Sequence, residues 1–179
     1  MLVDLTDNFT VNKTRIEIRD IESGDLVITS IRLLGMTDLE GGYKASNLIF
    51  APSKSGTLKI QCSQDEYFFV DRNEDVNPKD NKIIQIYFQW LLKGKSLQLE
   101  DIAFNTNSSE LFESAEPVLI RLREFLTLNA DINVEIQGHV FKQGKTTADG
   151  MAVSEARTKR IMNYLISYEI DRKRLTAFG

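Results

Sequence analysis

The sequence has little of the chemistry from which enzyme and metal sites are built. Its 179 residues include one cysteine, Cys62, and one histidine, His139. A lone cysteine cannot form an internal disulfide, and one histidine with one distant cysteine cannot build a zinc site. The Ser/His/acid, Cys/His and glycine-rich patterns of nucleophilic catalysis and phosphate binding are missing too. We therefore expect a protein that is not an enzyme and that needs no metal and no cofactor.

An excess of one charge and long apolar runs are also missing. The net charge is −4, with 12 basic and 14 acidic side chains in residues 1–95 and 10 and 12 in residues 96–179. This balance argues against the basic surface of a nucleic-acid binder, and the short basic run at 172–174 is expected to be a solvated face. No apolar run reaches the length of about 20 residues that spans a bilayer. We therefore expect no transmembrane segment and no signal sequence in this chain.

Residues 1–95 show the period of β-strands. Apolar and polar residues alternate in short runs, separated by turn residues such as Gly41-Gly42. Cys62 alternates with Leu58 and Ile60, which indicates a place in a core and not a reactive thiol. Short strands with turns at this spacing are typical of an all-β sandwich. The expected strands are 15–19, 26–34, 43–50, 56–62, 67–70 and 83–90.

The first part of this region has a likeness of its own. Residues 15–34 read as a strand, an Asp-x-x-Ser-Gly-Asp-Leu turn and a longer strand. The strand from Gly56 and the Tyr67-Phe-Phe run fit the same plan. Residues 10–92 thus resemble, over about 80 residues, the small sandwich of carboxypeptidase regulatory-like and Cna-B-type domains. The resemblance implies a spacer or an interaction module.

The periodicity changes after the polar, glycine-containing segment 92–96, which we take as the boundary between domains at 1–95 and 96–179. Beyond it, alternation predicts strands at 97–104, 132–137 and 175–178, and helical spacing predicts helices at 114–128 and 153–165. Ser114 is the candidate N-cap of the first helix, with Pro117 in its first turn. The order β-α-β-α-β predicts an α/β domain, one sheet with packed helices.

The C-terminal half, from about residue 97 to 179, resembles the OmpA-like (OmpA/MotB C-terminal) domain of bacterial envelope proteins. Six landmarks occur in the family's order: Asp101-Ile-Ala-Phe104, the serine-led helix from Ser114, Val134-Glu-Ile-Gln-Gly138-His139, Val153-Ser154-x-x-Arg157 with Tyr164-Leu165, Ile170 with Arg174-Leu175, and Phe178-Gly179. Such domains are non-catalytic and typically grip the diaminopimelate of the peptidoglycan stem peptide. The resemblance implies a periplasmic, outer-membrane-associated protein with peptidoglycan as its partner.

The resemblance also assigns roles to single residues. His139 would support the loop beside the ligand groove, and Phe104 would be a groove wall or a core residue. Phe141 stands where the family has the aspartate that grips diaminopimelate; it would stack on a sugar or peptide, or mark a partner surface. Asp149, in the loop before the second helix, is the candidate replacement for that acid, and a solvated loop acid is the alternative. Glu169 stands where the family has a glycine, which would change how the second helix ends.

Arg157 is the main candidate for ligand binding. If Ser154 caps the second helix, Arg157 lies in its first turn, where a cation opposes the helix dipole at a cost of roughly 0.3–1 kcal/mol. A ligand carboxylate would explain such an arginine, since free N–H groups and a guanidinium together form an anion site. The alternative is that Arg157 pairs with a carboxylate of the protein itself, such as Asp149 or Glu155.

Two functions follow, and the sequence leaves both open. In the first, the OmpA-like domain binds peptidoglycan and anchors the outer membrane or an envelope complex to the wall. In the second, it is a degenerate scaffold that has lost its ligand and binds another envelope protein. Phe141 in place of the acid motivates the second function, with the partner held near Phe141 or at an edge strand of the sandwich.

Overall fold

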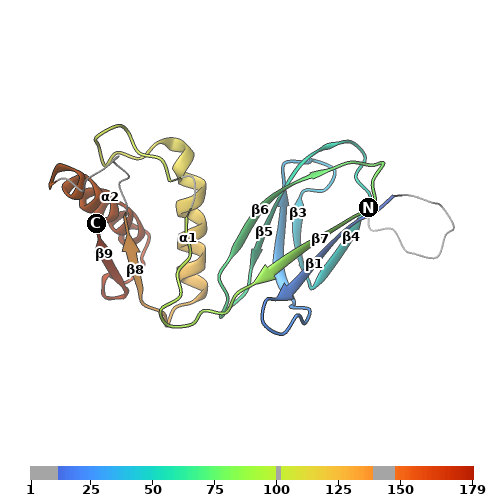
Figure 1. Ribbon diagram of the computed structural model, residues 1–179, viewed down its shortest axis with the longest axis horizontal. Helices are drawn as coiled ribbons and strands as arrows, with labels where there is room; N and C mark the ends of the chain where they lie inside the picture. The colour runs from blue at the N-terminus through green and yellow to red at the C-terminus, as the bar shows by residue number, and fades with distance from the viewer. Residues whose placement is uncertain (1–11, 100–101, 139–147) are drawn as a thin grey trace. The chain divides into compact units, whose positions relative to one another are not determined.

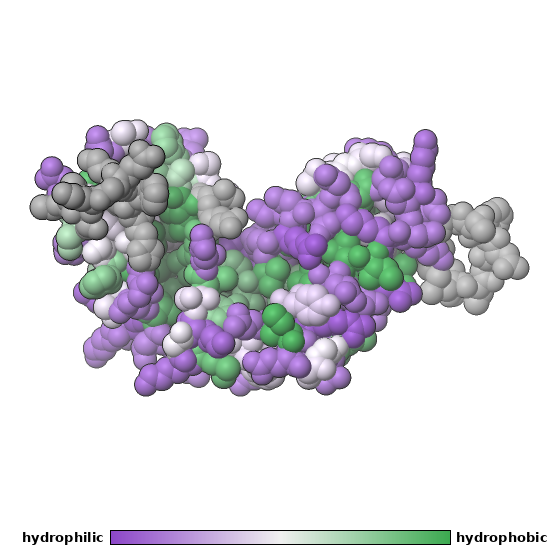
Figure 2. All heavy atoms as spheres, viewed as in Figure 1, coloured by the Kyte–Doolittle hydropathy of each residue, from purple (hydrophilic) through white to green (hydrophobic). Residues whose placement is uncertain are grey.

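The structure, a computed structural model, describes residues 12–99, 102–138 and 148–179 (Figure 1). The chain divides into two compact units, Met1–Lys95 and Ser96–Gly179, and each is described here by itself. Hydrophilic side chains cover most of the visible surface in Figure 2, and apolar side chains form separate patches among them.

The N-terminal unit is a β-sandwich. Its three-stranded sheet has the order β4-β1-β7, with β1 antiparallel to β4 and parallel to β7. Its four-stranded sheet has the order β3-β2-β5-β6 and is antiparallel throughout. The strands are β1 (Thr14–Asp20), β2 (Thr29–Leu34), β3 (Gly41–Ala45), β4 (Asn47–Phe50), β5 (Gly56–Ser63), β6 (Val70–Val76) and β7 (Lys82–Phe88). The predicted all-β class of this half is therefore confirmed.

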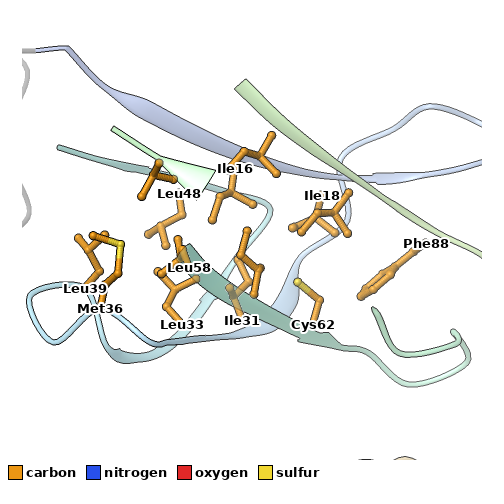
Figure 3. Close-up of a cluster of buried hydrophobic side chains, with 14 of the residues drawn as sticks. Ile16, Ile18, Ile31, Leu33, Met36, Leu39, Leu48, Leu58, Cys62 and Phe88 are labelled. Atoms are coloured by element: carbon orange, nitrogen blue, oxygen red, sulfur yellow. The ribbon is translucent and has the colours of Figure 1, made fainter. Parts of the chain in front are cut away.

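The core of the sandwich lies between the two sheets (Figure 3). Ile16 and Ile18 of β1 face the residues of β2 and β5, because alternate residues of a strand point to the same side. Cys62 is buried among them, as its alternation with Leu58 and Ile60 predicted. Other members of this buried set are Ile31, Leu33, Met36, Leu48, Ile84, Ile86 and Phe88.

Some expected strands have other bounds in the structure. The run 43–50 is two strands in different sheets, β3 and β4, because the chain crosses from one sheet to the other at Ser46. The run 26–34 becomes a strand only at Thr29, and Leu26 makes a single bridge to Arg19. The expected strand 67–70 precedes the regular strand β6, whose polar sequence Val-Asp-Arg-Asn-Glu-Asp-Val has no apolar alternation to reveal it.

The polar strand β6 protects an edge of the sandwich. The guanidinium of Arg72 donates from Nη1 to the backbone oxygen of Gln85, 2.9 Å away on β7. Lys82 Nζ donates to Glu74 Oε2 at 2.6 Å, so a second contact joins the two sheets. Burial disfavours the charged form of Glu74 and so acts to raise its pKa, but Lys82 and Arg72 together hold this pKa below the usual value.

A buried carboxylate organises one end of this unit. Asp20 Oδ1 accepts the backbone N–H groups of Glu22 and Ser23, each at 2.8 Å, and Oδ2 accepts the hydroxyl of Tyr67 at 3.1 Å. These donors, led by the N–H of Ser23, hold the pKa of Asp20 below its usual value. Burial, together with the neighbouring Asp20, raises the pKa of Tyr67 to about 12.

The C-terminal unit is an α/β domain, as predicted. Strands β8 and β9 are parallel, in the register Val134↔Leu175, and α2 packs against both strands. Its core consists of buried residues from both helices, among them Leu119, Phe125, Leu126, Ile161 and Leu165. The elements are the 3₁₀ turn η1 (Glu113–Ala115), α1 (Glu116–Leu128), β8 (Val134–Gln137), α2 (Ala148–Ser167), the 3₁₀ turn η2 (Arg172–Arg174) and β9 (Leu175–Phe178).

Two expectations for the start of this unit are wrong. The expected strand 97–104 is not a regular strand in its described residues, where only Phe104 forms a bridge, to Leu111. Ser114 lies inside η1 and does not cap α1, whose N-cap is Ala115 and has no side-chain cap bond. Pro117 does lie in the first turn of α1, as predicted.

The basic run 172–174 is not simply a solvated face. Arg174 donates from Nε to the oxygen of Ile132 and from Nη2 to the oxygens of Leu126 and Asn129, at 2.7–2.9 Å. These carbonyls lie at and just beyond the C-terminal end of α1, where the negative pole of the helix dipole favours a cation. Arg174 therefore ties the end of α1 to the segment before β9.

Glu169 takes the backbone conformation of the glycine it replaces. Its φ is +69°, and the backbone N–H of Ile170 donates to the oxygen of Leu165. This is the left-handed residue that usually ends a helix, so α2 ends in the common way although a residue with a Cβ stands at this position. A residue with a Cβ pays roughly 1–2 kcal/mol for this conformation.

We predict that Glu169→Gly stabilises the C-terminal unit. Relief of the left-handed strain outweighs the roughly 0.5–1 kcal/mol by which glycine favours the unfolded chain, which leaves a gain of up to about 1 kcal/mol. Denaturant unfolding followed by helical circular dichroism measures it, because α1 and α2 both lie in this unit. Glu169→Ala keeps the Cβ and is the control; an equal gain from alanine would contradict the strain argument.

We also predict a loss of stability at alkaline pH that depends on Tyr67. Because folding raises the pKa of Tyr67, its protonated hydroxyl contributes to the free energy of unfolding. This contribution is complete below a pH of about 10, the ordinary pKa of tyrosine, and it declines as the pH rises to about 12. The stability difference between the unmodified protein and Tyr67→Phe should therefore shrink over this range. Denaturant unfolding followed by the fluorescence of Trp90, the single tryptophan, reports on this unit. The exposed Tyr87 supplies the control variant, Tyr87→Phe, and a pH-independent difference for Tyr67→Phe would refute the prediction.

Candidate functional site

Arg157 lies well inside α2 and not in its first turn. The helix begins at Ala148, six residues before Ser154, so Ser154 is not its N-cap. The free N–H groups of a helix start are therefore not beside Arg157, and the predicted anion site made of these groups and the guanidinium is wrong.

The guanidinium of Arg157 is fixed by backbone carbonyls and by a ring. Nε donates to the oxygen of Ser108 at 2.9 Å, and Nη2 donates to the oxygen of Asn105 at 3.2 Å. Its Cζ lies 4.9 Å from the centroid of the Phe104 ring, within cation–π range. The side chain is half-buried. Two carbonyls and an aromatic face thus hold the plane of the guanidinium in one orientation.

Neither protein carboxylate suggested by the sequence pairs with Arg157. Glu155 instead accepts from Lys159 at 2.6 Å, a hydrogen bond that lowers its pKa below the usual value. Asp149 is exposed, in the first turn of α2 and not in a loop. Within the described residues no carboxylate lies in ion-pair distance of Arg157, and its Nη1 has no hydrogen-bond acceptor there. Among the described residues the guanidinium therefore keeps unused donors and a charge that no carboxylate compensates.

The loop under Arg157 is a compact turn. The backbone N–H of Asn105 donates to the oxygen of Glu110 at 2.9 Å, and the Asn105 side chain donates to the Glu110 carboxylate at 2.8 Å. Asn107 has a φ of +54°, a left-handed conformation that asparagine tolerates. Sequence reasoning missed Asn105 and Ser108, because both contribute backbone oxygens. The turn-forming Asn-Thr-Asn-Ser run after Phe104 is the signal that could have found them.

Ser154 holds α2 in place. It is buried, and its Oγ donates to the oxygen of Gly138 at 2.6 Å. A Cβ on Gly138 would lie 2.7 Å from Thr158 Cγ2 and 2.9 Å from Ser154 Oγ, so only glycine allows this approach. Gly138 follows β8, and its N–H donates to the oxygen of Phe178 at 2.9 Å. The helix that carries Arg157 is thus seated on the ends of both parallel strands.

The other residues from the sequence are placed as follows. Phe104 is half-buried, with its ring against the guanidinium, so it is joined to Arg157 as part of one cluster. Asp149 precedes Arg157 by eight residues, or about 12 Å along the helix axis. His139 and Phe141 lie outside the described residues. The binding site remains a prediction for all six candidate residues: Arg157, Asp149, His139, Phe104, Ser154 and Phe141.

Two general properties bear on the chemistry of the chain. In the parts of the chain that the structure describes, no three His, Cys, Asp or Glu side chains gather as metal ligands. No described helix combines the length and the apolar character needed to cross a membrane.

The geometry defines a class of protein: an α/β domain in which a helix seated on the carboxyl ends of two parallel strands presents a fixed arginine. Residues 103–179, from the loop under Arg157 to the end of β9, match the OmpA family. The C-terminal unit is therefore an OmpA-like domain, and the recognition from sequence landmarks is confirmed. The OmpA family is a family of non-catalytic binding domains with a place in the cell envelope.

The remaining comparisons add little. No curated protein matches the chain. Among solved structures it is similar to the Bacillus anthracis TIE protein, with 8% identity and a TM-score of 0.36. That likeness covers 45% of this chain and 17% of the other, and at this level it carries no argument about fold or function.

We predict that Gly138→Ala destabilises the C-terminal unit. The added methyl group would meet Thr158 and Ser154, and overpacking of this kind costs typically 1–3 kcal/mol, a rough range. The midpoint of denaturant unfolding, followed by helical circular dichroism, should fall accordingly. Gly42→Ala adds a Cβ with nothing within 4 Å in the other unit, and it should leave this helical transition unchanged. An unchanged midpoint for Gly138→Ala would show that the approach of α2 does not require glycine.

Proposed function

We propose that this chain belongs to a non-catalytic cell-envelope protein whose OmpA-like domain binds peptidoglycan through the diaminopimelate stem peptide. In this role the domain anchors the outer membrane or an envelope complex to the wall, from the periplasmic side. The observation that carries the proposal is Arg157: a half-buried, fixed guanidinium with no carboxylate partner among the described residues.

The arginine is suited to hold a carboxylate of the stem peptide. Its two carbonyl contacts use Nε and one donor of Nη2, which leaves the Nη1 group and the second Nη2 donor. Charge-assisted bonds from a guanidinium to a carboxylate are among the stronger hydrogen bonds in proteins. The contacts to Asn105, Ser108 and Phe104 fix the side chain before a ligand arrives, so less conformational entropy is lost on binding.

The ligand's ammonium group needs an acid, and we assign this role to Asp149. The family's usual aspartate is replaced by Phe141, so an acid must come from elsewhere. Asp149 is exposed on the helix that carries Arg157, and an arginine side chain leans toward the N-terminal end of its helix, in the direction of Asp149. His139 and Phe141 stay candidate ligand residues on the resemblance alone, since both lie outside the described residues.

A second function is motivated by the same replacement. Phe141 removes the acid with which the family grips diaminopimelate and puts an aromatic side chain in its place. In that case the domain would be a scaffold that binds another envelope protein. Fixed guanidinium groups also bind carboxylates of proteins, so only a binding experiment separates the two functions.

We predict that the unmodified protein pellets with diaminopimelate-type peptidoglycan sacculi and that Arg157→Ala abolishes pelleting. Arg157→Lys should pellet weakly, because an ammonium cannot keep the geometry set by the two carbonyls and the ring. Asp149→Asn should also weaken pelleting. The matched control is Arg160→Ala, which removes the same charge from an exposed position of the same helix.

The outcomes separate the two functions. If Arg157→Ala folds, by circular dichroism and thermal unfolding, and fails to pellet while Arg160→Ala pellets, the carboxylate site is supported. If both arginine variants pellet equally, binding does not use the guanidinium of Arg157. If the unmodified protein stays in the supernatant, the peptidoglycan proposal is wrong and the scaffold function takes its place.

A further inference from the structure

An open pocket of about 580 Å³ lies at one end of the N-terminal sandwich, and no step of the proposed function uses it. One side is formed by the turn after β1, with Glu22 and Asp25. Another side is aromatic, where Tyr67 and Trp90 stack with their ring centroids 4.2 Å apart. The segment Leu26–Ile28, which leads into β2, completes the lining.

The acidic and aromatic sides of the pocket are tied together by Asp20. One oxygen of this buried carboxylate holds the backbone of the acidic turn, and the other accepts the hydroxyl of Tyr67. The ring of Tyr67 in turn supports that of Trp90. The turn and the rings are therefore held in one arrangement before any ligand arrives, which lowers the entropic cost of binding.

Several residues in and beside the pocket are apolar although their side chains are exposed. Leu26 is 47% exposed, Ile28 62% and Trp90 36%, and the neighbouring Ile21 is 56% exposed. Single exposed apolar residues are ordinary, but several gathered around one pocket are typical of a binding surface. A partner that covers them gains the free energy of apolar burial.

The charge of the pocket has one sign. Glu22 and Asp25 are exposed, and within the described residues neither carboxylate is paired with a cation. Arg19, the nearest cation along the chain, is turned to Glu17 and to the backbone oxygen of Gly24. Carboxylates beside the face of a tryptophan suit an arginine or lysine side chain, which combines a charged head with an apolar stem.

We propose that this pocket is a docking site for a partner protein, and that its occupant is a peptide segment with an arginine or lysine flanked by apolar residues. The guanidinium or ammonium lies between the indole of Trp90 and the carboxylates of Glu22 and Asp25. The flanking apolar side chains cover Leu26 and Ile28. This inference concerns the N-terminal unit alone and does not rest on peptidoglycan binding.

The experiment uses the full chain and two blocked tripeptides, acetyl-Val-Arg-Val-amide and the same peptide with citrulline for arginine. Citrulline keeps the shape of arginine and removes its charge. Trp90 is the only tryptophan, so its fluorescence reports on the pocket directly. We expect a saturable change with a Kd of roughly 1 mM or below for the arginine peptide, and binding about tenfold weaker for the citrulline peptide.

Variants connect the signal to the pocket. The double variant Glu22→Gln/Asp25→Asn should weaken binding of the arginine peptide about tenfold, to the level of citrulline. Asp80→Asn, an exposed acid of the same unit outside this pocket, should leave binding unchanged. Because Glu22 and Asp25 are exposed turn residues, both variants should keep the unfolding midpoint of the unmodified protein, measured by circular dichroism.

Two results would overturn the proposal. One is the absence of a saturable change with the arginine peptide. The other is equal binding of the arginine and citrulline peptides, which would show that the pocket recognises apolar side chains and not the positive charge. A failure of sacculus binding in the same preparation affects neither result.

Discussion

The close seating of α2 on the ends of β8 and β9 is the constraint on which the C-terminal unit depends. Gly138 offers no Cβ, so the helix backbone approaches the strand end, and the Ser154 hydroxyl satisfies the carbonyl that this approach buries. A buried polar group without a partner costs a large part of a small domain's stability, so the glycine and the serine act as a pair. Arg157 is one turn further along the same helix, and its position over the Asn105–Ser108 loop is set by this packing.

The loop contacts explain how Arg157 is kept half-buried without a neighbouring acid among the described residues. Burying a charge without compensation is expensive, and proteins usually compensate it with an opposite charge. Here two carbonyl dipoles and the face of Phe104 compensate the charge in part. Partial compensation leaves the guanidinium with attraction for an anion, whereas an internal salt bridge would have satisfied it. This choice of partners supports the proposed binding role of Arg157 over a purely structural one.

Sequence periodicity predicted the architecture of both units. The predictions failed where the backbone conformation or a contact does not depend on the pattern of apolar side chains. The strand 175–178 and the inward residues of β7 follow from alternation, because each has one buried face. Strand β6 was missed, since an edge strand fixed by Arg72 and Lys82 needs no apolar alternation. The start of α2 was placed five residues late, because Ser154 has the chemistry of a cap while its hydroxyl bonds to another element. The contacts of Arg157 could not be predicted, since backbone oxygens leave no residue signature.

The two units present opposite chemistries. The OmpA-like unit offers a fixed cation, and the sandwich offers carboxylates with no cation partner among the described residues, beside an exposed tryptophan. The carboxylates of a wall peptide suit the cation of the OmpA-like unit, whereas the acidic pocket of the sandwich suits a basic side chain. If each site binds the ligand that its charge selects, one chain holds a wall carboxylate and a basic segment of another protein together. Linkage of the two sites raises the effective concentration only for a partner that is itself held at the wall, because the second binding event is then intramolecular. For such a partner a weak pocket on the sandwich would suffice.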